Sequence, residues 1–95
     1  MYCKVLKVWP LATRSYTDRQ GAAQTWDSKG FLLFDGKHSF YVEASQEAAR
    51  AIDALNVQPN TAVLCDVRFV ARSYKTQQGD ERYNNDCILL NMTLA

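Results

Sequence analysis

Residues 38–69 decide the fold, and they read HSFYVEASQEAARAIDALNVQPNTAVLCDVRF. Apolar and polar residues alternate from His38 to Ala44, which is typical of a strand. Ser45 is a suitable N-cap, and a helix of about three turns is predicted after it because apolar residues recur at helical spacing. Those residues are Ala48, Ala49, Ile52 and Leu55. From Thr61 the period returns to two, which indicates another strand.

The chain before this stretch is predicted to form two strands. The first runs from Tyr2 to Trp9 and bends or bulges at Pro10, because proline cannot donate a ladder hydrogen bond. Its pairing resumes through residues 13–16. The second strand extends from about Ala22 to Phe34, and Gly30 within it indicates a bulge or a close backbone approach.

The chain after the helix is predicted to form a long hairpin that turns at residues 77–80 and ends with a strand from Arg82 to Leu94. A turn centred on Gln78 and Gly79 places apolar side chains opposite one another on one face, as a core requires. The expected pairs are Phe69 with Ile88, Val67 with Leu90 and Cys65 with Met92, and on the other face Tyr74 with Tyr83 and Arg72 with Asn85.

The predicted order is therefore strand, strand, strand, helix, strand, strand in one domain over residues 1–95. This order predicts a mainly β fold, namely a five-stranded OB-fold-like barrel with the helix at one end. An SH3-like barrel and an α+β sandwich are the alternatives, although an SH3-like barrel usually has only a short turn where this chain has a helix.

Composition excludes several classes of protein. The chain has 47% hydrophobic and 22% charged residues, which excludes a disordered chain or a fibre, and no apolar run approaches a membrane span. Eleven basic and ten acidic residues give a net charge of +1, so only a local basic patch is expected. Residues 1–37 hold the surplus, with six basic and three acidic residues.

The cysteines and the N-terminus indicate a cytoplasmic protein. Cys3, Cys65 and Cys87 are odd in number, and their spacing fits neither a disulfide framework nor a zinc site. We therefore expect reduced thiols packed as small apolar residues. The first residues lack the apolar run of a secretory signal.

Residues suited to catalysis are sparse, and we expect no enzyme activity, metal or cofactor. His38 is the only histidine, and no nucleophile motif surrounds it. Asp66 with Asp86, or Asp18 with Asp27, could form carboxylate pairs, but aspartates in turns and at strand edges are usually solvated. The glycines are isolated and form no phosphate-binding loop.

Two hairpin tips have similar sequences. Residues 14–21 read RSYTDRQG and residues 72–79 read RSYKTQQG, with five of eight positions identical. Ordinary polar hairpins could produce this match by coincidence. Alternatively, each hairpin is an arm that carries an arginine and a tyrosine beside a flexible turn.

Arms of this kind suit single-stranded nucleic acid, because guanidinium and ammonium groups contact phosphates and aromatic faces stack on bases. Trp26 is left open between core and ligand. Trp9 is predicted to lie in the core or a subunit contact, and Phe34, Phe40 and Phe69 in the core. The candidate nucleic-acid-binding residues are Arg14, Tyr16, Arg19, Trp26, Lys29, Phe31, Tyr41, Arg68, Arg72, Tyr74, Lys75, Arg82 and Tyr83.

With its basic first hairpin at residues 14–21 and the aromatic strand end KGFLLF at residues 29–34, the chain resembles small OB-fold single-stranded-DNA-binding proteins of filamentous phages and similar mobile elements. The resemblance covers nearly the whole length. It implies a homodimer that coats single-stranded DNA during replication. The clear helix is more similar to the bacterial type, but that type's long acidic tail is absent here, so recruitment of repair partners through a tail is not implied.

The alternative function is that of a small β-barrel module that binds another protein, or an inhibitor of a host enzyme, because tyrosine and arginine also anchor protein interfaces. A homo-oligomer, most simply a dimer, is expected for a separate reason. Apolar residues on the outer side of the last two strands would need a cover, which a second subunit could provide. They are Leu64, Val70, Cys87 and Leu89.

Overall fold

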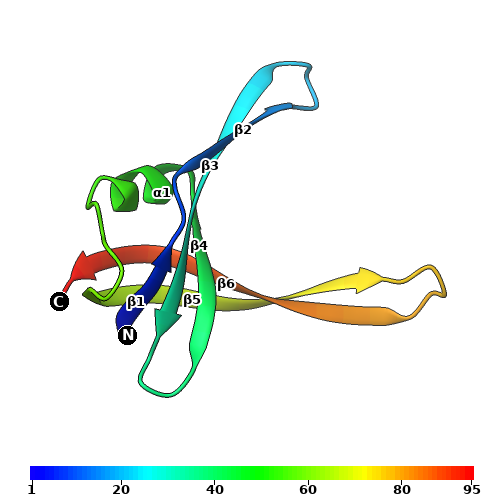
Figure 1. Cartoon of the computed structure of the whole chain (residues 1–95). Coiled ribbons are helices and arrows are strands. Elements are labelled where there is room, and N and C mark those ends of the chain that lie inside the picture. Colours follow the sequence, from blue (N-terminus) through cyan, green and yellow to red (C-terminus); the bar gives the residue numbers. More distant parts are fainter.

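The structure is a computed structural model that describes residues 1–95, and it is mainly β, as predicted. Six strands and one helix follow one another along the chain (Figure 1). They are β1 (Tyr2–Val8), β2 (Ala12–Thr17), β3 (Ala23–Phe34), β4 (Ser39–Ser45), α1 (Gln46–Asp53), β5 (Ala62–Lys75) and β6 (Glu81–Leu94). No helix has both the length and the apolar character that crossing a membrane requires.

The strands form one mixed sheet in the order β1-β5-β6-β4-β3-β2. Because β1 pairs with β3 as well as with β5, five of the strands are joined in a ring of pairings. All pairs are antiparallel except β4 with β6, which run parallel and meet at Glu43 and Ile88. The prediction of five strands is corrected to six, because the chain around Pro10 leaves the ladder and divides the first strand into β1 and β2.

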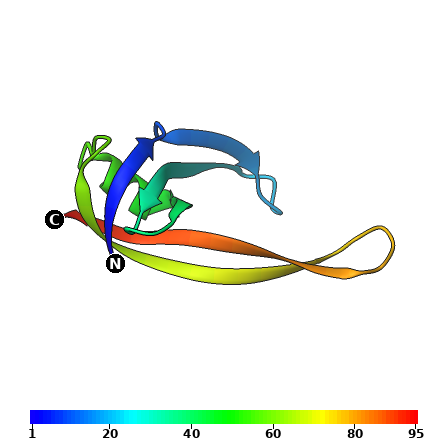
Figure 2. The ribbon, with the colours of Figure 1, turned by 60° about the horizontal axis from the view of Figure 1, so that its bottom comes forward.

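Two hairpins extend beyond the ring. The first arm is β2 with the start of β3, paired from Ala12 opposite Ser28 to Thr17 opposite Ala23. The second arm is the distal part of β5 and β6, residues 68–75 and 81–88. Figures 1 and 2 show that the two arms diverge from the body of the molecule. Each arm is a two-stranded ribbon whose side chains lie largely exposed.

The core fills the ring and is covered by α1 through Ala49 and Ile52. Its largest fully buried side chains are Phe31, Leu33, Leu89, Val5, Val42, Val63 and Cys3. The helix ends at Asp53 and is shorter than predicted, because Asn56 and Asn60 adopt left-handed backbone conformations that redirect the chain to β5. Leu55 therefore lies outside the helix and is exposed.

All three cysteines are free thiols, and Cys3 and Cys65 are buried in the core. Burial raises the pKa of the Cys65 thiol to about 11. The thiol therefore stays protonated near neutral pH and packs as a small apolar side chain, as expected from the sequence.

The predicted register of β5 and β6 holds only next to the body. Cys65 faces Met92 as predicted, but a bulge between Asp66 and Val67 leaves Leu90 without a partner and shifts the rest of the ladder by one residue. The corrected pairs are Val67 with Leu89, Phe69 with Cys87, Arg72 with Asn84, Ser73 with Tyr83 and Tyr74 with Arg82.

The bulge also exchanges the faces of several apolar residues. Leu89 lies in the core and Cys87 packs against it, whereas Leu90 is exposed, so the expected outer apolar surface is only partly present. Phe69 is 60% exposed, which overturns its assignment to the core, and its ring centroid lies 6.3 Å from that of the partly buried Phe40. Phe69 follows Cys65 and Val67 on the same face of β5, but it lies where the hairpin leaves the body, so its side chain is exposed.

Candidate nucleic-acid interface

A groove lies between the bases of the two arms, over the outer faces of β3, β4 and β6. We define the groove by its nine lining residues. They are Trp26, Tyr41, Glu43, Ser45, Arg72, Asn85, Asp86, Cys87 and Ile88. The parallel pairing of β4 with β6 brings these segments together, although they are far apart in the sequence.

Strand alternation explains why aromatic side chains point into the groove. On β4, Val42 and Ala44 are buried in the core, so Tyr41 and Glu43 point outward. Tyr41 is 46% exposed, which confirms its predicted orientation. Trp26, left open by the sequence, is 43% exposed and lines the groove.

Tyr41 is held in place on three sides. The Trp9 ring meets it edge-on, with the ring centroids 5.2 Å apart, and its hydroxyl donates a hydrogen bond to Glu43 Oε2 at 3.0 Å. A Cβ atom on Gly30 would lie 2.3 Å from Tyr41 Oη, so only glycine leaves room for the ring at this position. Gly30 is therefore a close approach rather than a bulge, because the β3–β4 register is continuous across it.

Partial burial raises the pKa of the Tyr41 phenol, and the hydrogen bond to Glu43 raises it further. The phenol therefore remains a protonated donor at neutral pH. Trp9 is 41% exposed beside Tyr41, and no second subunit is needed to explain its packing.

Arg72 supplies the positive charge of the groove and is paired with Asp86. Its Nε forms an ion pair with Asp86 Oδ2, and its Nη2 donates to Oδ1 at 3.3 Å. The Arg72 side chain is 71% exposed, so water screens this pair and its contribution to stability is small. The charged residues that line the groove are two acidic ones, Glu43 and Asp86, and one basic one, Arg72, so the groove itself carries a net charge of −1.

More basic and aromatic side chains continue from the groove onto the arms. Directly paired residues share a face of a ladder, so Arg14 lies on the same face as Trp26, and Tyr74 on the same face as Arg82. By register, the candidates on the groove side are Arg14, Tyr16, Arg68, Tyr74 and Arg82, and all are exposed. Arg19 is exposed in the turn of the first arm. Lys75 and Tyr83 occupy the alternate positions and lie on the other face of the second arm.

Two further candidates predicted from the sequence do not belong to this interface either, because they are buried. Phe31 is fully buried in the core. The Lys29 side chain is 9% exposed, with its Nζ 3.0 Å from Asp53 Oδ1 of α1. Both point inward because odd-numbered residues of β3 face the core from Asp27 onward. The prediction that they contact a ligand is therefore corrected.

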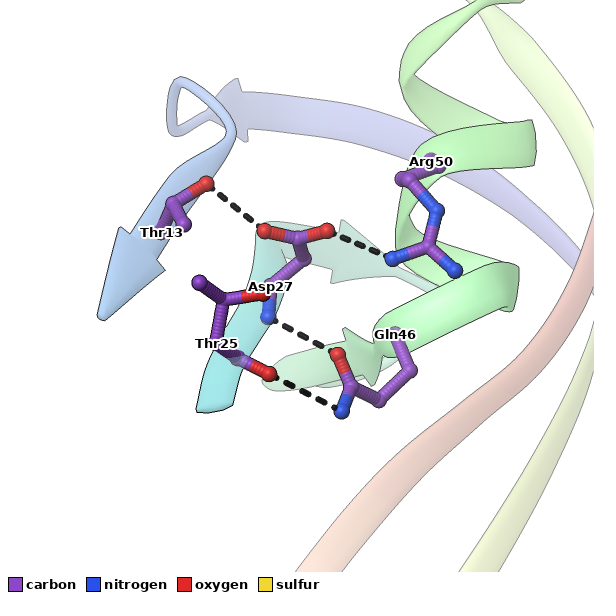
Figure 3. A network of polar contacts seen from close by, with 5 residues as sticks. All are labelled: Thr13, Thr25, Asp27, Gln46 and Arg50. Carbon is purple, nitrogen blue, oxygen red and sulfur yellow. Dashed lines mark hydrogen bonds and ion pairs between the residues drawn. The ribbon is translucent and has the colours of Figure 1, made fainter. Parts of the chain in front are cut away.

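The first arm is fixed to the helix by a polar network around Asp27 (Figure 3). Asp27 accepts a hydrogen bond from Thr13 Oγ1 at 2.6 Å and forms an ion pair with Arg50 at 2.5 Å. The Gln46 side chain accepts from the Asp27 backbone N–H and donates to the Thr25 carbonyl. Because Trp26 lies between Thr25 and Asp27, the network positions the groove's tryptophan.

The network makes stability depend on pH. The Thr13 hydroxyl and then the Arg50 guanidinium hold the pKa of the Asp27 carboxyl below its ordinary value. A lowered pKa stabilises the fold above the unfolded-state value of about 3.9, and that contribution is lost as pH falls through the folded-state value. Asp27→Asn is expected to lower Tm at neutral pH and to converge with the wild type in acid. Thermal denaturation followed by circular dichroism across pH tests this.

Asp18 and Asp35 also have lowered pKa values, but both residues are present in the wild type and in Asp27→Asn. The difference in Tm between these two proteins across pH therefore reports the contribution of Asp27. A constant difference in Tm at every pH would contradict the account.

The carboxylate pairs considered from the sequence have other partners. Asp27 and Asp86 bind arginines, and Asp18 accepts hydrogen bonds from the backbone of its own turn. No three His, Cys, Asp or Glu side chains gather closely enough to hold a metal ion.

No protein-family model matches the chain, and no curated protein is significantly similar to it. Six of the nine lining residues were not among the candidates predicted from the sequence, namely Glu43, Ser45, Asn85, Asp86, Cys87 and Ile88. Alternation with Tyr41 could have identified Glu43, whereas the four residues of β6 depend on the β4–β6 pairing and on the shifted register.

Proposed function

We propose that this protein binds single-stranded DNA with little sequence specificity through the groove. The observation that carries the proposal is the meeting of Trp26, Tyr41 and Arg72 in one groove, although they come from three different strands. Exposed aromatic faces accept unstacked bases, and arginines contact phosphates. The exposed basic residues of both arms extend the path along which a strand would run.

We propose that the ring of strands is an OB-fold-like barrel, supported by the parallel β4–β6 pair and by a helix between β4 and β5. OB-folds bind oligonucleotides on an outer strand face flanked by hairpin loops, which corresponds to the groove and its arms. The resemblance to small phage-type single-stranded-DNA-binding proteins supports a role in replication in the cytoplasm.

We also propose a homodimer. Apolar side chains remain exposed along β5 and β6, including Phe69 at 60%, Leu64 at 48% and Leu90 at 46%. A second copy would cover part of this surface. Sedimentation velocity tests this, since a monomer at every concentration would contradict it.

Binding is tested by fluorescence polarisation of a labelled thymidine oligonucleotide at about 50 mM and about 300 mM salt. About four to six phosphate contacts predict a slope of log K against log salt of roughly −3 to −4. An unlabelled duplex should compete poorly, because its bases cannot stack on the aromatic side chains. Absence of binding at low salt would favour the protein-interaction alternative.

Asp86 competes with phosphate for Arg72, so removing its charge should strengthen binding. Asp86→Asn is expected to raise affinity about threefold to tenfold at low salt, because one more cation becomes available and a nearby like charge is lost. The slope against log salt should steepen by up to about 1. Asp80→Asn, at the turn of the second arm and without an ion pair, is the control and should change affinity less. Equal effects of the two substitutions would contradict a specific role of Asp86.

A further inference from the structure

We infer that Glu43 contacts the base edge of one nucleotide in the groove and favours guanine over thymine at that position. The inference rests on the proposed function. It adds a single-position preference to binding that is otherwise insensitive to sequence.

The Glu43 carboxylate is oriented toward a ligand before one binds. Its Oε2 accepts a hydrogen bond from Tyr41 Oη at 3.0 Å, and Oε1 has no hydrogen-bond partner in the chain. The Tyr41 ring is itself held between the Trp9 ring and the backbone of Gly30, which has no side chain to displace it. A base stacked on Tyr41 would therefore place its edge near a fixed carboxylate with a free oxygen.

Charge decides which part of a nucleotide can lie beside Glu43. The groove carries two carboxylates and one guanidinium, and that guanidinium is already paired with Asp86. A phosphate next to Glu43 would be repelled, whereas Arg14, Arg68 and Arg82 offer exposed positive charge on the arms. The phosphates are therefore expected over the arms, with a base in the groove.

A carboxylate only accepts hydrogen bonds, so it selects bases by their donors. Guanine presents N1–H and N2–H side by side, which match the free Oε1 of Glu43 and the second lone pair of its Oε2. Adenine and cytosine present an amino group next to a ring nitrogen that repels the carboxylate. Thymine presents one N–H between two carbonyl oxygens. The expected order is guanine first, adenine and cytosine next, and thymine last.

The test compares a thymidine oligonucleotide of about 12 nucleotides with the same strand carrying one central guanine. The wild type is expected to bind the guanine strand about fivefold more tightly. Glu43→Gln should remove this preference, because an amide donates to the thymine carbonyls as readily as it accepts from guanine. Glu47→Gln, on the exposed side of α1, removes the same charge outside the groove and should keep the preference.

A third oligonucleotide tests the inference on the wild-type protein alone, so the result does not depend on whether the variant folds. This strand carries a central inosine, which lacks the N2 amino group of guanine, and it should bind the wild type with intermediate affinity. Equal affinity of the wild type for all three strands would overturn the inference while leaving the proposed function in place. So would a Glu43→Gln protein that binds every strand more tightly by one common factor, since Glu43 would then act by charge alone. Binding to none of the strands would remove the proposed function itself, and this inference with it.

Discussion

Replacing both Trp26 and Tyr41 by alanine should weaken binding to single-stranded DNA about a hundredfold. Each base stacked on an aromatic side chain contributes about 1–3 kcal/mol, and the two rings offer two stacking surfaces. Both side chains are more than two-fifths exposed, so the fold should lose little stability. Fluorescence polarisation measures the affinity, and thermal denaturation confirms that the variant is folded.

Two further variants separate stacking from other effects. Gly30→Ala keeps both aromatic residues but introduces a Cβ where the Tyr41 ring lies, so it should reproduce much of the loss that Tyr41→Ala causes. Tyr83→Ala removes a tyrosine that is 66% exposed on the other face of the second arm, so it should leave affinity nearly unchanged. Wild-type affinity in the double variant, or an equal loss in Tyr83→Ala, would contradict the assignment of the groove.

Phe31→Ala should destabilise the fold by about 3–5 kcal/mol, because it leaves a cavity in the core. Phe31 is fully buried with Leu33, Val42 and Leu89 as fellow core residues. For a chain of this size, each kcal/mol shifts Tm by about 4–8 °C, so a decrease of more than about 12 °C is expected. Thermal or urea denaturation followed by circular dichroism measures the change.

The Phe31 prediction distinguishes the two roles considered for this residue. Phe31→Leu is the matched control, since it retains most of the buried volume and should cost much less stability. If Phe31→Ala kept the wild-type Tm and lost affinity for DNA, the ring would face the ligand and the described core would be wrong.

The order of elements could be predicted from the sequence because each element has a clear local pattern. Alternation at residues 38–44, helical spacing after Ser45 and the interruption at Pro10 all correspond to observed features. Alternation also placed Tyr41 on the open face. These predictions succeed because burial on one face of an element imposes a short period on the sequence.

The features that were not predicted depend on contacts distant in the sequence. The bulge opposite Asp66 cannot be recognised locally, and the one-residue shift that it causes moves Leu89 into the core and leaves Leu90 exposed. Lys29 looked like a phosphate contact because lysine is usually exposed. Its inward position follows from the alternation of β3, and its charge is paired there by Asp53, which lies on α1 far downstream in the sequence.

Part of the candidate site was therefore visible in the sequence, and part required the fold. Residue type and hairpin position selected Arg72, alternation with Phe40 selected Tyr41, and Trp26 was selected as a candidate whose orientation was left open. The parallel β4–β6 pair, which the sequence does not specify, brings them into one groove together with Glu43 and Asp86.

The most direct test of the central claim is a nuclear magnetic resonance titration of isotope-labelled protein with a short thymidine oligonucleotide. The chain of 10.8 kDa is small enough for every backbone amide and both indole N–H groups to be followed. We predict the largest shifts at the Trp26 indole, at Tyr41 and at Arg72, with small shifts at α1. No shifts, or shifts centred on α1 and the adjoining residues 54–60, would contradict the proposal that the groove binds single-stranded DNA.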